Sequence, residues 1–124
     1  MKKKQKILIV EDDKSILDAL KIKLEKSNLL VSTAKNGKIG LDKALKEHPD
    51  LVLTDIMMPV MDGLSMIQEI RKDTWGKNAQ IIILSVLTEA DKVENAMRNG
   101  VYDFLVKSDW KINDVIAVVK EKLK

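Results

Sequence analysis

The sequence predicts an α/β domain built on a parallel sheet with helices packed against both faces. Segments of strand character alternate five times with segments of helical periodicity, an order that favours parallel strands joined by right-handed crossovers. Four of the five strand segments are almost continuously apolar, which is typical of strands covered on both faces. No repeat, low-complexity tract or flexible linker divides the chain, so we expect residues 1–124 to form a single domain.

The strand segments are short. They cover residues 6–10, 30–34, 51–54, 80–84 and 101–106. The segment at 30–34 alternates apolar and polar residues, which favours a position at the edge of the sheet. Asn36-Gly37 after the second strand, and Pro59 with Asp62-Gly63 after the third, indicate turns.

Each strand segment is followed by a segment whose apolar residues recur at helical spacing. We expect helices at about residues 14–27, 38–47, 64–72, 88–99 and 108–123, with a loop at 73–79. Asp13, Thr88 and Ser108 carry side-chain oxygens that favour the N-cap position. Gly100 favours the C-terminal end of the fourth helix, because glycine readily adopts the left-handed backbone found at such ends.

The composition excludes several classes of protein. There are no cysteines, so we expect neither a disulfide framework nor a thiolate metal site. The 22 basic and 19 acidic residues are scattered and aromatic residues make up 3%, which disfavours direct nucleic-acid binding by this domain. No apolar run approaches the ~20 residues of a membrane span, and the N-terminal apolar run is too short for a signal peptide. We therefore expect a cytoplasmic protein that makes no membrane contact.

Charged and hydroxyl side chains follow four of the strand segments at the point where each strand ends. Glu11 and Asp12 follow the first strand, Asp55 the third, Ser85 the fourth and Lys107 the fifth. The carboxyl ends of parallel strands meet at one edge of the sheet, where open α/β sheets bind their ligands. The sequence therefore predicts that three carboxylates, a hydroxyl and an ammonium group lie together at this edge.

This set of groups indicates phosphoryl transfer assisted by a divalent cation. Three close carboxylates repel one another unless a cation lies among them, and Mg²⁺ suits a site that leaves room for phosphate oxygens. Lys107 and Ser85 would contact the phosphoryl group, and the Asp55 carboxylate would attack the phosphorus atom. Taken singly, each residue has an ordinary explanation as a helix cap, a loop residue or a solvated lysine, so the joint occurrence carries the prediction. His48 precedes the third strand and is expected at the opposite edge of the sheet, away from this chemistry.

These residues and their neighbours resemble the receiver domain of two-component response regulators. The resemblance covers essentially the whole chain and depends on Ile7 to Asp13, on Asp55 with Met57, Pro59 and Gly63, on Ser85, and on Phe104 to Lys107. It implies a flavodoxin-like fold with five helices and strand order 2-1-3-4-5. It also implies a domain that takes a phosphoryl group from a partner phosphohistidine and then changes conformation.

The resemblance implies a metal site and a phosphoacceptor. Glu11, Asp12 and Asp55 would hold Mg²⁺, with Mn²⁺ as an alternative, and Asp12 would bind it more directly than Glu11. The backbone carbonyl of Met57 would be a further metal ligand. Asp55 would accept the phosphoryl group.

The resemblance also implies a switch and a set of partners. Lys107 and Ser85 would assist the reaction, and Ser85 with Phe104 would form the conformational switch. The implied partners are a sensor histidine kinase or a histidine phosphotransfer protein. An output domain or downstream protein would contact the face made by the fourth helix, the fifth strand and the fifth helix. The domain would catalyse only its own phosphorylation and dephosphorylation, and so would not be an enzyme.

Three positions, Val86, Phe104 and Ser108, depart from the usual family pattern. Ser108 replaces a proline that commonly follows the lysine in a cis bond. A cis bond before a residue other than proline costs about 2.5–4 kcal/mol, so we expect the bond between Lys107 and Ser108 to be trans. The main alternative function is a Mg²⁺-dependent phosphohydrolase of the haloacid dehalogenase type, which needs a second aspartate where this chain has Met57. A receiver domain that binds partners without being phosphorylated is a third possibility.

Overall fold

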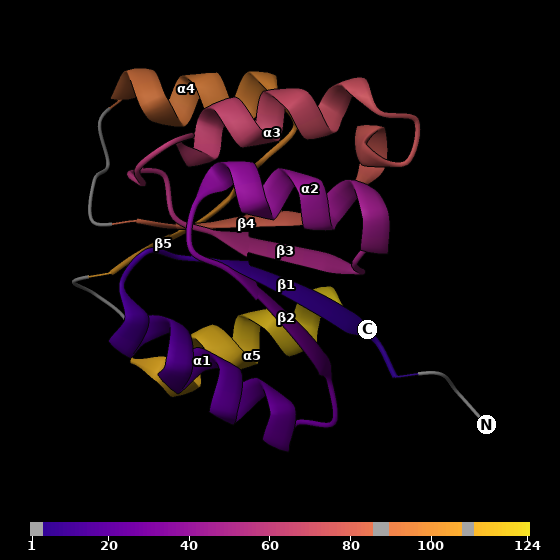
Figure 1. Ribbon diagram of the computed structural model, residues 1–124. Helices are drawn as coiled ribbons and strands as arrows, with labels where there is room; N and C mark the ends of the chain where they lie inside the picture. Colours follow the sequence, from indigo (N-terminus) through magenta and orange to yellow (C-terminus); the bar gives the residue numbers. More distant parts are fainter. Residues whose placement is uncertain (1–3, 86–89, 108–110) are drawn as a thin grey trace.

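The computed structural model of the chain describes residues 4–85, 90–107 and 111–124, and these residues form three layers (Figure 1). The strands are β1 (Lys6–Val10), β2 (Leu30–Ala34), β3 (Leu51–Thr54), β4 (Ile81–Ser85) and β5 (Asp103–Val106). The helices are α1 (Lys14–Lys26), α2 (Gly37–Glu47), α3 (Gly63–Lys72), α4 (Ala90–Arg98) and α5 (Ile112–Lys122), with a 3₁₀ turn, η1 (Gly76–Asn78), in the predicted loop. Among the described residues, no helix has the length and apolar character needed to cross a membrane.

The sheet confirms the predicted topology. The strands are parallel and their order is β2-β1-β3-β4-β5. Val10 lies opposite both Ala34 and Thr54, and Ser85 lies opposite Val106, so the strands end close to one level. The residues that follow β1, β3, β4 and β5 therefore emerge along one edge of the sheet.

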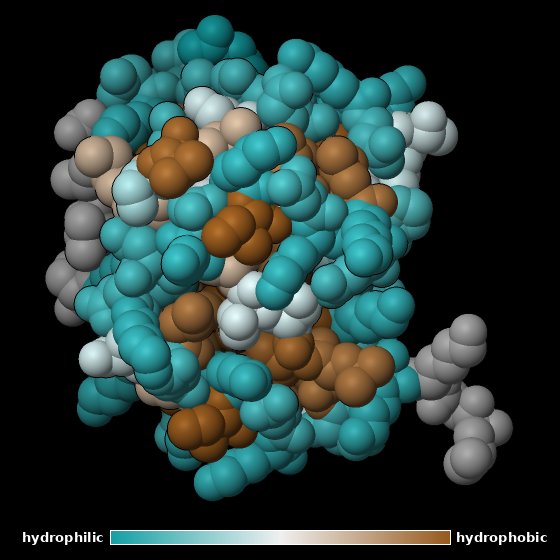
Figure 2. Space-filling model, viewed as in Figure 1, coloured by the Kyte–Doolittle hydropathy of each residue, from teal (hydrophilic) through white to brown (hydrophobic). Residues whose placement is uncertain are grey.

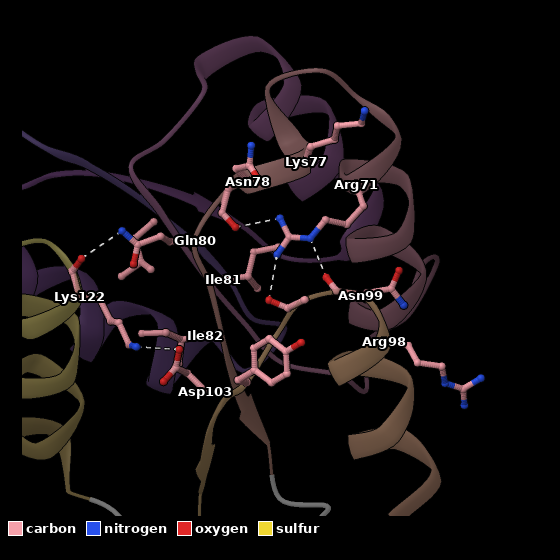
Figure 3. Close-up of a pocket in the computed structure, with 14 residues that line it drawn as sticks. Arg71, Lys77, Asn78, Gln80, Ile81, Ile82, Arg98, Asn99, Asp103 and Lys122 are labelled. Carbon is pink, nitrogen blue, oxygen red and sulfur yellow. Dashed lines mark hydrogen bonds and ion pairs between the residues drawn. The ribbon is translucent and has the colours of Figure 1, made fainter.

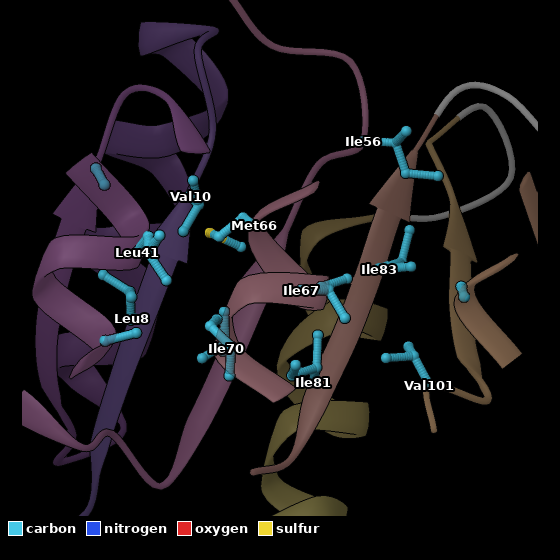
Figure 4. Packing of buried hydrophobic residues seen from close by; sticks show 14 residues of the cluster. Leu8, Val10, Leu41, Ile56, Met66, Ile67, Ile70, Ile81, Ile83 and Val101 are labelled. Atoms are coloured by element: carbon cyan, nitrogen blue, oxygen red, sulfur yellow. The ribbon is translucent and has the colours of Figure 1, made fainter. Parts of the chain in front are cut away.

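The sheet separates two apolar cores, because alternate residues of each strand point to opposite faces. Helices α2, α3 and α4 cover one face and α1 and α5 cover the other (Figure 1). The strand residues under α2, α3 and α4 are Leu8, Val10, Ala34, Val52, Ile81 and Ile83. Figure 4 shows four of them, Leu8, Val10, Ile81 and Ile83, facing residues of the covering helices. Those over α1 and α5 are Ile7, Ile9, Leu51, Leu53, Ile82 and Leu84. Burying such a side chain contributes about 1.5–3 kcal/mol, so the two cores make the sheet a rigid support for whatever lies at its edge.

The C-terminal end of α4 shows why β5 is shorter than predicted. Gly100 has φ +74°, and its N–H donates to the carbonyl of Met97 at 3.0 Å, as the prediction of a glycine cap requires. The N–H of Val101 donates to the carbonyl of Ala96 in the same helix end. Because that N–H is used by the helix, β5 begins at Asp103 and not at residue 101.

The N-cap predictions have different outcomes. Asp13 caps α1, and its Oδ1 accepts two backbone N–H groups of the first turn. The prediction that the last helix begins at about residue 108 is wrong, because α5 begins at Ile112 with Lys111 as its N-cap; Ser108 itself lies outside the described residues. The carboxylate of Asp114 accepts the Lys111 N–H at 2.9 Å, and this contact starts the helix later in the chain. Predictions that concern Val86, Thr88, Trp110 and the bond between Lys107 and Ser108 lie outside the described residues.

Gly63 lets α3 begin directly beneath the end of β3. Its N–H donates to the carbonyl of Ile56 at 2.8 Å, and a Cβ at this position would overlap the backbone carbonyl of Asp55. We expect Gly63→Ala to lower the free energy of unfolding by about 1–3 kcal/mol, because the backbone must shift to admit the methyl group. Urea denaturation measures this change, with Gln68→Ala at an exposed position of α3 as the control. Equal stability of the two variants would contradict the close approach.

Candidate functional site

The carboxyl ends of four strands bring the predicted site residues together. Glu11 and Asp12 follow β1, Asp55 follows β3, Ser85 ends β4 and Lys107 follows β5. Backbone hydrogen bonds continue the strand alignment into the site. The N–H of Asp55 donates to the carbonyl of Val10 at 3.0 Å, and the N–H of Lys107 donates to the carbonyl of Ser85 at 2.8 Å.

Lys107 joins two buried carboxylates. Its Nζ lies 2.8 Å from Oδ2 of Asp55 and 2.6 Å from Oε1 of Glu11. The side chains of Lys107, Asp55 and Glu11 are 11%, 7% and 2% exposed, so salt in the solvent screens these ion pairs only weakly. The other oxygen of Asp55, Oδ1, accepts the N–H of Ile56 at 2.7 Å, which fixes the orientation of the carboxylate.

Burial and charge shift the protonation equilibria of this group. Burial raises the pKa of Glu11, and it outweighs the opposing hydrogen bonds from Lys107 and from the N–H of Asp13. Burial acts to lower the pKa of Lys107, but the hydrogen bonds and negative charges of Asp55 and Glu11 outweigh burial and raise it. Lys107 is therefore held as a cation, while the nearby carboxylates carry more negative charge than one ammonium group neutralises.

Glu11, Asp12 and Asp55 could together hold a metal ion. One carboxylate oxygen from each lies within 4.8 Å of the others, and Asp12 is the exposed member of the group. Oε1 of Glu11 is buried, and beyond its 2.6 Å contact with Nζ of Lys107 it has no hydrogen-bond partner among the described residues. A buried carboxylate oxygen with lone pairs to spare, beside two further carboxylates, fits a hard divalent cation.

The remaining predicted residues surround this centre. Ser85 is 2% exposed, and Phe104 is partly buried and packs against the core under α2, α3 and α4. The side chain of Met57 is 51% exposed, and its Sδ lies 3.3 Å from Nζ of Lys92 in α4. Sequence analysis missed Lys92, because a lysine within a helical pattern gives no sign that it reaches a distant loop.

His48 takes no part in this group. It forms the C-cap of α2 with φ 49°, ahead of β3 and hence at the opposite edge of the sheet, as predicted. Its ring stacks on that of Trp75, with 4.8 Å between the ring centroids. This contact gives Trp75 a packing role for which the sequence offered no signal.

Comparison with known proteins identifies the family to which this arrangement belongs. Residues 7–120 match the family model of the response regulator receiver domain. The chain is a member of that family. Accepting a phosphoryl group is the general role of receiver domains. The predicted family resemblance is thus confirmed by the family model, and the predicted fold is confirmed by the strand order β2-β1-β3-β4-β5.

Relatives and solved structures agree with this membership. The receiver domain is 40% identical over 105 residues to the probable transcriptional regulator ycf27 of Guillardia theta, covering 84% of this chain and 40% of that protein. It is 34% identical over 119 residues to the response regulator ArlR of Staphylococcus epidermidis, covering 95% of this chain and 52% of that protein. The chemotaxis response regulator CheY4 of Vibrio cholerae superimposes with a TM-score of 0.88 at 27% identity, covering 98% of this chain and 100% of that one. The chain thus spans about half the length, or less, of these curated relatives.

The raised pKa of Glu11 predicts that a neutral side chain stabilises the metal-free receiver domain. An acid whose pKa is higher in the folded state binds more protons there, so stability falls as pH rises from 4.5 through the folded pKa of Glu11. We expect Glu11→Gln to raise the free energy of unfolding at pH 7 without divalent cations, and the gain to shrink as the pH approaches 4.5.

Urea denaturation at several pH values measures this effect. Glu69→Gln, at a surface pair with Lys72, serves as the control and should change stability by less than about 0.5 kcal/mol. A Glu11→Gln variant that is less stable than the wild type at pH 7 would contradict the direction of the Glu11 pKa shift.

Proposed function

We propose that the receiver domain accepts a phosphoryl group on Asp55 from the phosphohistidine of a sensor histidine kinase or of a histidine phosphotransfer protein. The observation that carries this proposal is the position of Lys107, whose ammonium group lies 2.8 Å from Asp55 within a group of three carboxylates. A carboxylate attacks a phosphoryl group efficiently only when cations neutralise the phosphoryl oxygens. The chain supplies one such cation beside Asp55.

Glu11, Asp12 and Asp55 would hold Mg²⁺ in this function, with Mn²⁺ as an alternative, and the backbone carbonyl of Met57 would add a further ligand. The ion, when bound, neutralises negative charge that develops on the phosphoryl oxygens. Oε2 of Glu11 accepts the N–H of Asp13 at 3.1 Å, and this bond orients the carboxylate of Glu11. The exposed carboxylate of Asp12 gives the site an opening to solvent.

In the transfer, an oxygen of Asp55 forms a bond to phosphorus while the bond between phosphorus and the donor imidazole nitrogen breaks. The electron pair of the broken bond stays on that nitrogen, which takes a proton from water. Lys107 stays protonated, because the neighbouring carboxylates raise its pKa, and would move from Asp55 to a phosphoryl oxygen. Ser85, which ends the neighbouring strand, would donate its hydroxyl to another phosphoryl oxygen.

Ser85 and Phe104 would convert this reaction into a conformational change. Movement of Ser85 toward the phosphoryl group would vacate space that Phe104, on the neighbouring strand β5, could enter. Two packings of one core would then be biased by a single covalent change, and the change would reach the face made by α4, β5 and α5. Amide chemical shifts of the protein with and without a phosphoryl mimic test this. Changes confined to a few residues around Asp55 would contradict the switch.

A phosphohydrolase that turns over external phosphomonoesters is the alternative function. It would need an acid–base aspartate two residues after Asp55, and that position holds Met57, whose side chain is 51% exposed beside Lys92. We therefore propose that the domain catalyses only its own phosphorylation and dephosphorylation. Many cycles of turnover on small phosphomonoesters above background would favour the hydrolase.

Intact-mass spectrometry tests the proposed function directly. Incubation with phosphoramidate and Mg²⁺ should add the mass of one phosphoryl group, and peptide mapping should locate it on Asp55. The same incubation with a chelator in place of Mg²⁺ should add none. Failure to gain mass under the first condition, or a phosphoryl group located on another residue, would refute the proposal.

Mg²⁺ should also raise the melting temperature of the unphosphorylated domain. The ion binds the three gathered carboxylates of the folded state and not the unfolded chain, so its binding shifts the equilibrium toward folding. Asp12→Asn should weaken this response, because it removes the exposed ligand. An unchanged melting temperature in millimolar Mg²⁺ would count against the metal assignment.

A further inference from the structure

A second concave region lies at the amino-terminal ends of β4 and β5, at the edge of the sheet opposite Asp55 (Figure 3). Its volume is about 530 Å³. The charged side chains that line it are Arg71, Lys77, Arg98, Lys122 and Asp103. Four cations against one carboxylate leave an excess of three positive charges, which equals the formal net charge of the whole chain. We call this region the basic groove, because cations outnumber carboxylates among its lining residues.

Arg71 gives the basic groove a fixed positive charge. Its Nε donates to the carbonyl of Asn99 at 2.7 Å, and its Nη1 donates to the carbonyl of Ala79 at 2.8 Å (Figure 3). The same Nη1 also donates to the carbonyl of Gly76 at 2.7 Å. Within the part of the chain that the structure describes, Arg71 forms no ion pair with a carboxylate. Burial lowers the pKa of Arg71, as it does for a cation without a nearby anion. Because backbone carbonyls accept from its Nε, Nη1 and Nη2 atoms, Arg71 adds positive charge to the wall of the basic groove and leaves direct contact with an anion to the cations at the rim.

Two cations at the rim are free to turn toward a ligand. Lys77 is exposed in η1, and Arg98 at the end of α4 contacts Glu94 at 3.7 Å with both side chains 70% exposed. An exposed pair of this kind contributes at most about 1 kcal/mol, so an anion can displace it. Lys122, in contrast, is paired with Asp103 at 3.0 Å, which fixes it at the wall.

The uncharged part of the lining suits a heterocyclic base. Tyr102 is 69% exposed as a residue, so its aromatic side chain is available for stacking. The side-chain amide of Asn78 also lines the basic groove and carries donors and an acceptor for a base edge. The amide groups of Gln80 and Asn99 donate to the carbonyls of Lys122 and Asn95, so they offer a base mainly their side-chain oxygens. The volume falls within the roughly 300–1,000 Å³ that is usual for small-molecule sites.

We propose that the basic groove binds a nucleotide, with its base on Tyr102 and its phosphates on Lys77 and Arg98. Phosphate alone would explain the cations but not the exposed ring among the amides. The basic groove shares no residue with the group around Asp55. A negative result for nucleotide binding would therefore leave the proposed phosphorylation of Asp55 untouched, and the reverse also holds.

Calorimetric titration in metal-free buffer tests the proposal with ADP, pyrophosphate and adenosine as probes. The chelator keeps the carboxylates around Asp55 from recruiting the probes through a metal. We expect ADP to bind one to one. Lys77→Gln combined with Arg98→Gln should weaken ADP and pyrophosphate by about tenfold or more, the effect of losing charge-assisted hydrogen bonds. Tyr102→Leu should weaken ADP and adenosine and leave pyrophosphate unchanged.

A matched control variant distinguishes specific binding in the basic groove from nonspecific electrostatic attraction of an anion to the protein surface. Lys21→Gln combined with Lys23→Gln removes the same charge from the exposed side of α1, and it should leave ADP binding unchanged. Absence of saturable ADP binding would overturn the proposal, as would equal weakening by the control pair. Pyrophosphate that binds as tightly as ADP, with no effect of Tyr102→Leu, would overturn the assignment to a nucleotide. Melting temperatures of all variants confirm that each is folded.

Discussion

Replacing Asp55 with asparagine should abolish phosphorylation of the receiver domain and leave its fold intact. The amide lacks the negative charge of the attacking oxygen, so the bond to phosphorus cannot form in the same way. Asparagine has the same shape and can still accept the N–H of Ile56, while Lys107 keeps its ion pair with Glu11 at 2.6 Å. We expect a complete loss of the mass gain with phosphoramidate and Mg²⁺, and a change in unfolding free energy below about 2 kcal/mol.

Asp62→Asn is the matched control for this experiment. Asp62 lies in the loop that follows β3 and caps α3 by accepting the N–H of Ser65 at 2.7 Å. Asparagine caps helices as well as aspartate does, so this variant should keep both its stability and its phosphorylation. Undiminished phosphorylation of Asp55→Asn would place the acceptor elsewhere, and unfolding of that variant would show that Asp55 is needed for the fold.

Replacing Lys107 with methionine should cost about 3–5 kcal/mol of stability at neutral pH without a divalent cation. Methionine fills a similar volume but leaves Asp55 and Glu11, at 7% and 2% exposure, without their cation, and an uncompensated buried charge is costly. Loss of Lys107 removes influences that lower the pKa of Glu11, so the folded pKa of Glu11 rises further. Stability should therefore recover as pH falls toward 4.5, where protons neutralise this carboxylate.

Lys122→Met separates this effect from the loss of any lysine. Lys122 pairs with Asp103 at 3.0 Å, with both side chains more than a third exposed, so its loss should cost less than about 1 kcal/mol. Urea denaturation at pH 7 and pH 5 compares the two variants, and added Mg²⁺ should partly restore Lys107→Met. Equal losses in the two variants, or a Lys107→Met loss that does not depend on pH, would contradict the role of Lys107 as the internal cation.

The sequence predicted the sheet and the composition of the site well, for a physical reason. Continuous apolar runs such as residues 7–10 and 51–53 identify strands buried on both faces, and the topology of such sheets then gathers the residues at the strand ends, among them Asp55 and Ser85, at one edge. Local sequence patterns predicted the first and last residues of the helices less accurately. Ser108 is a good cap by type, yet the contact between Asp114 and the Lys111 N–H starts α5 later.

Contacts between distant segments could not be predicted from the sequence. Nothing in the pattern indicated that Glu11 would be buried against Lys107 while its neighbour Asp12 remained exposed. The same holds for Lys92 beside Met57, since side-chain reach across the fold leaves no periodic signal. These contacts set the charge balance of the site, and they depend on packing that only the folded chain reveals.

The position of Lys107 has a consequence for the order in which the domain matures during synthesis. Glu11 and Asp55 leave the ribosome well before Lys107, whose ammonium group pairs with both carboxylates in the folded sheet. A nascent chain that ends before β5 would have to bury two carboxylates with no internal counter-ion, which opposes early closure of that edge. The first strands can therefore pair during translation, but the carboxyl edge of the sheet closes only when the last strand is added. Chains truncated within α4 should thus remain open there, and exposed to proteases, until translation supplies the final lysine.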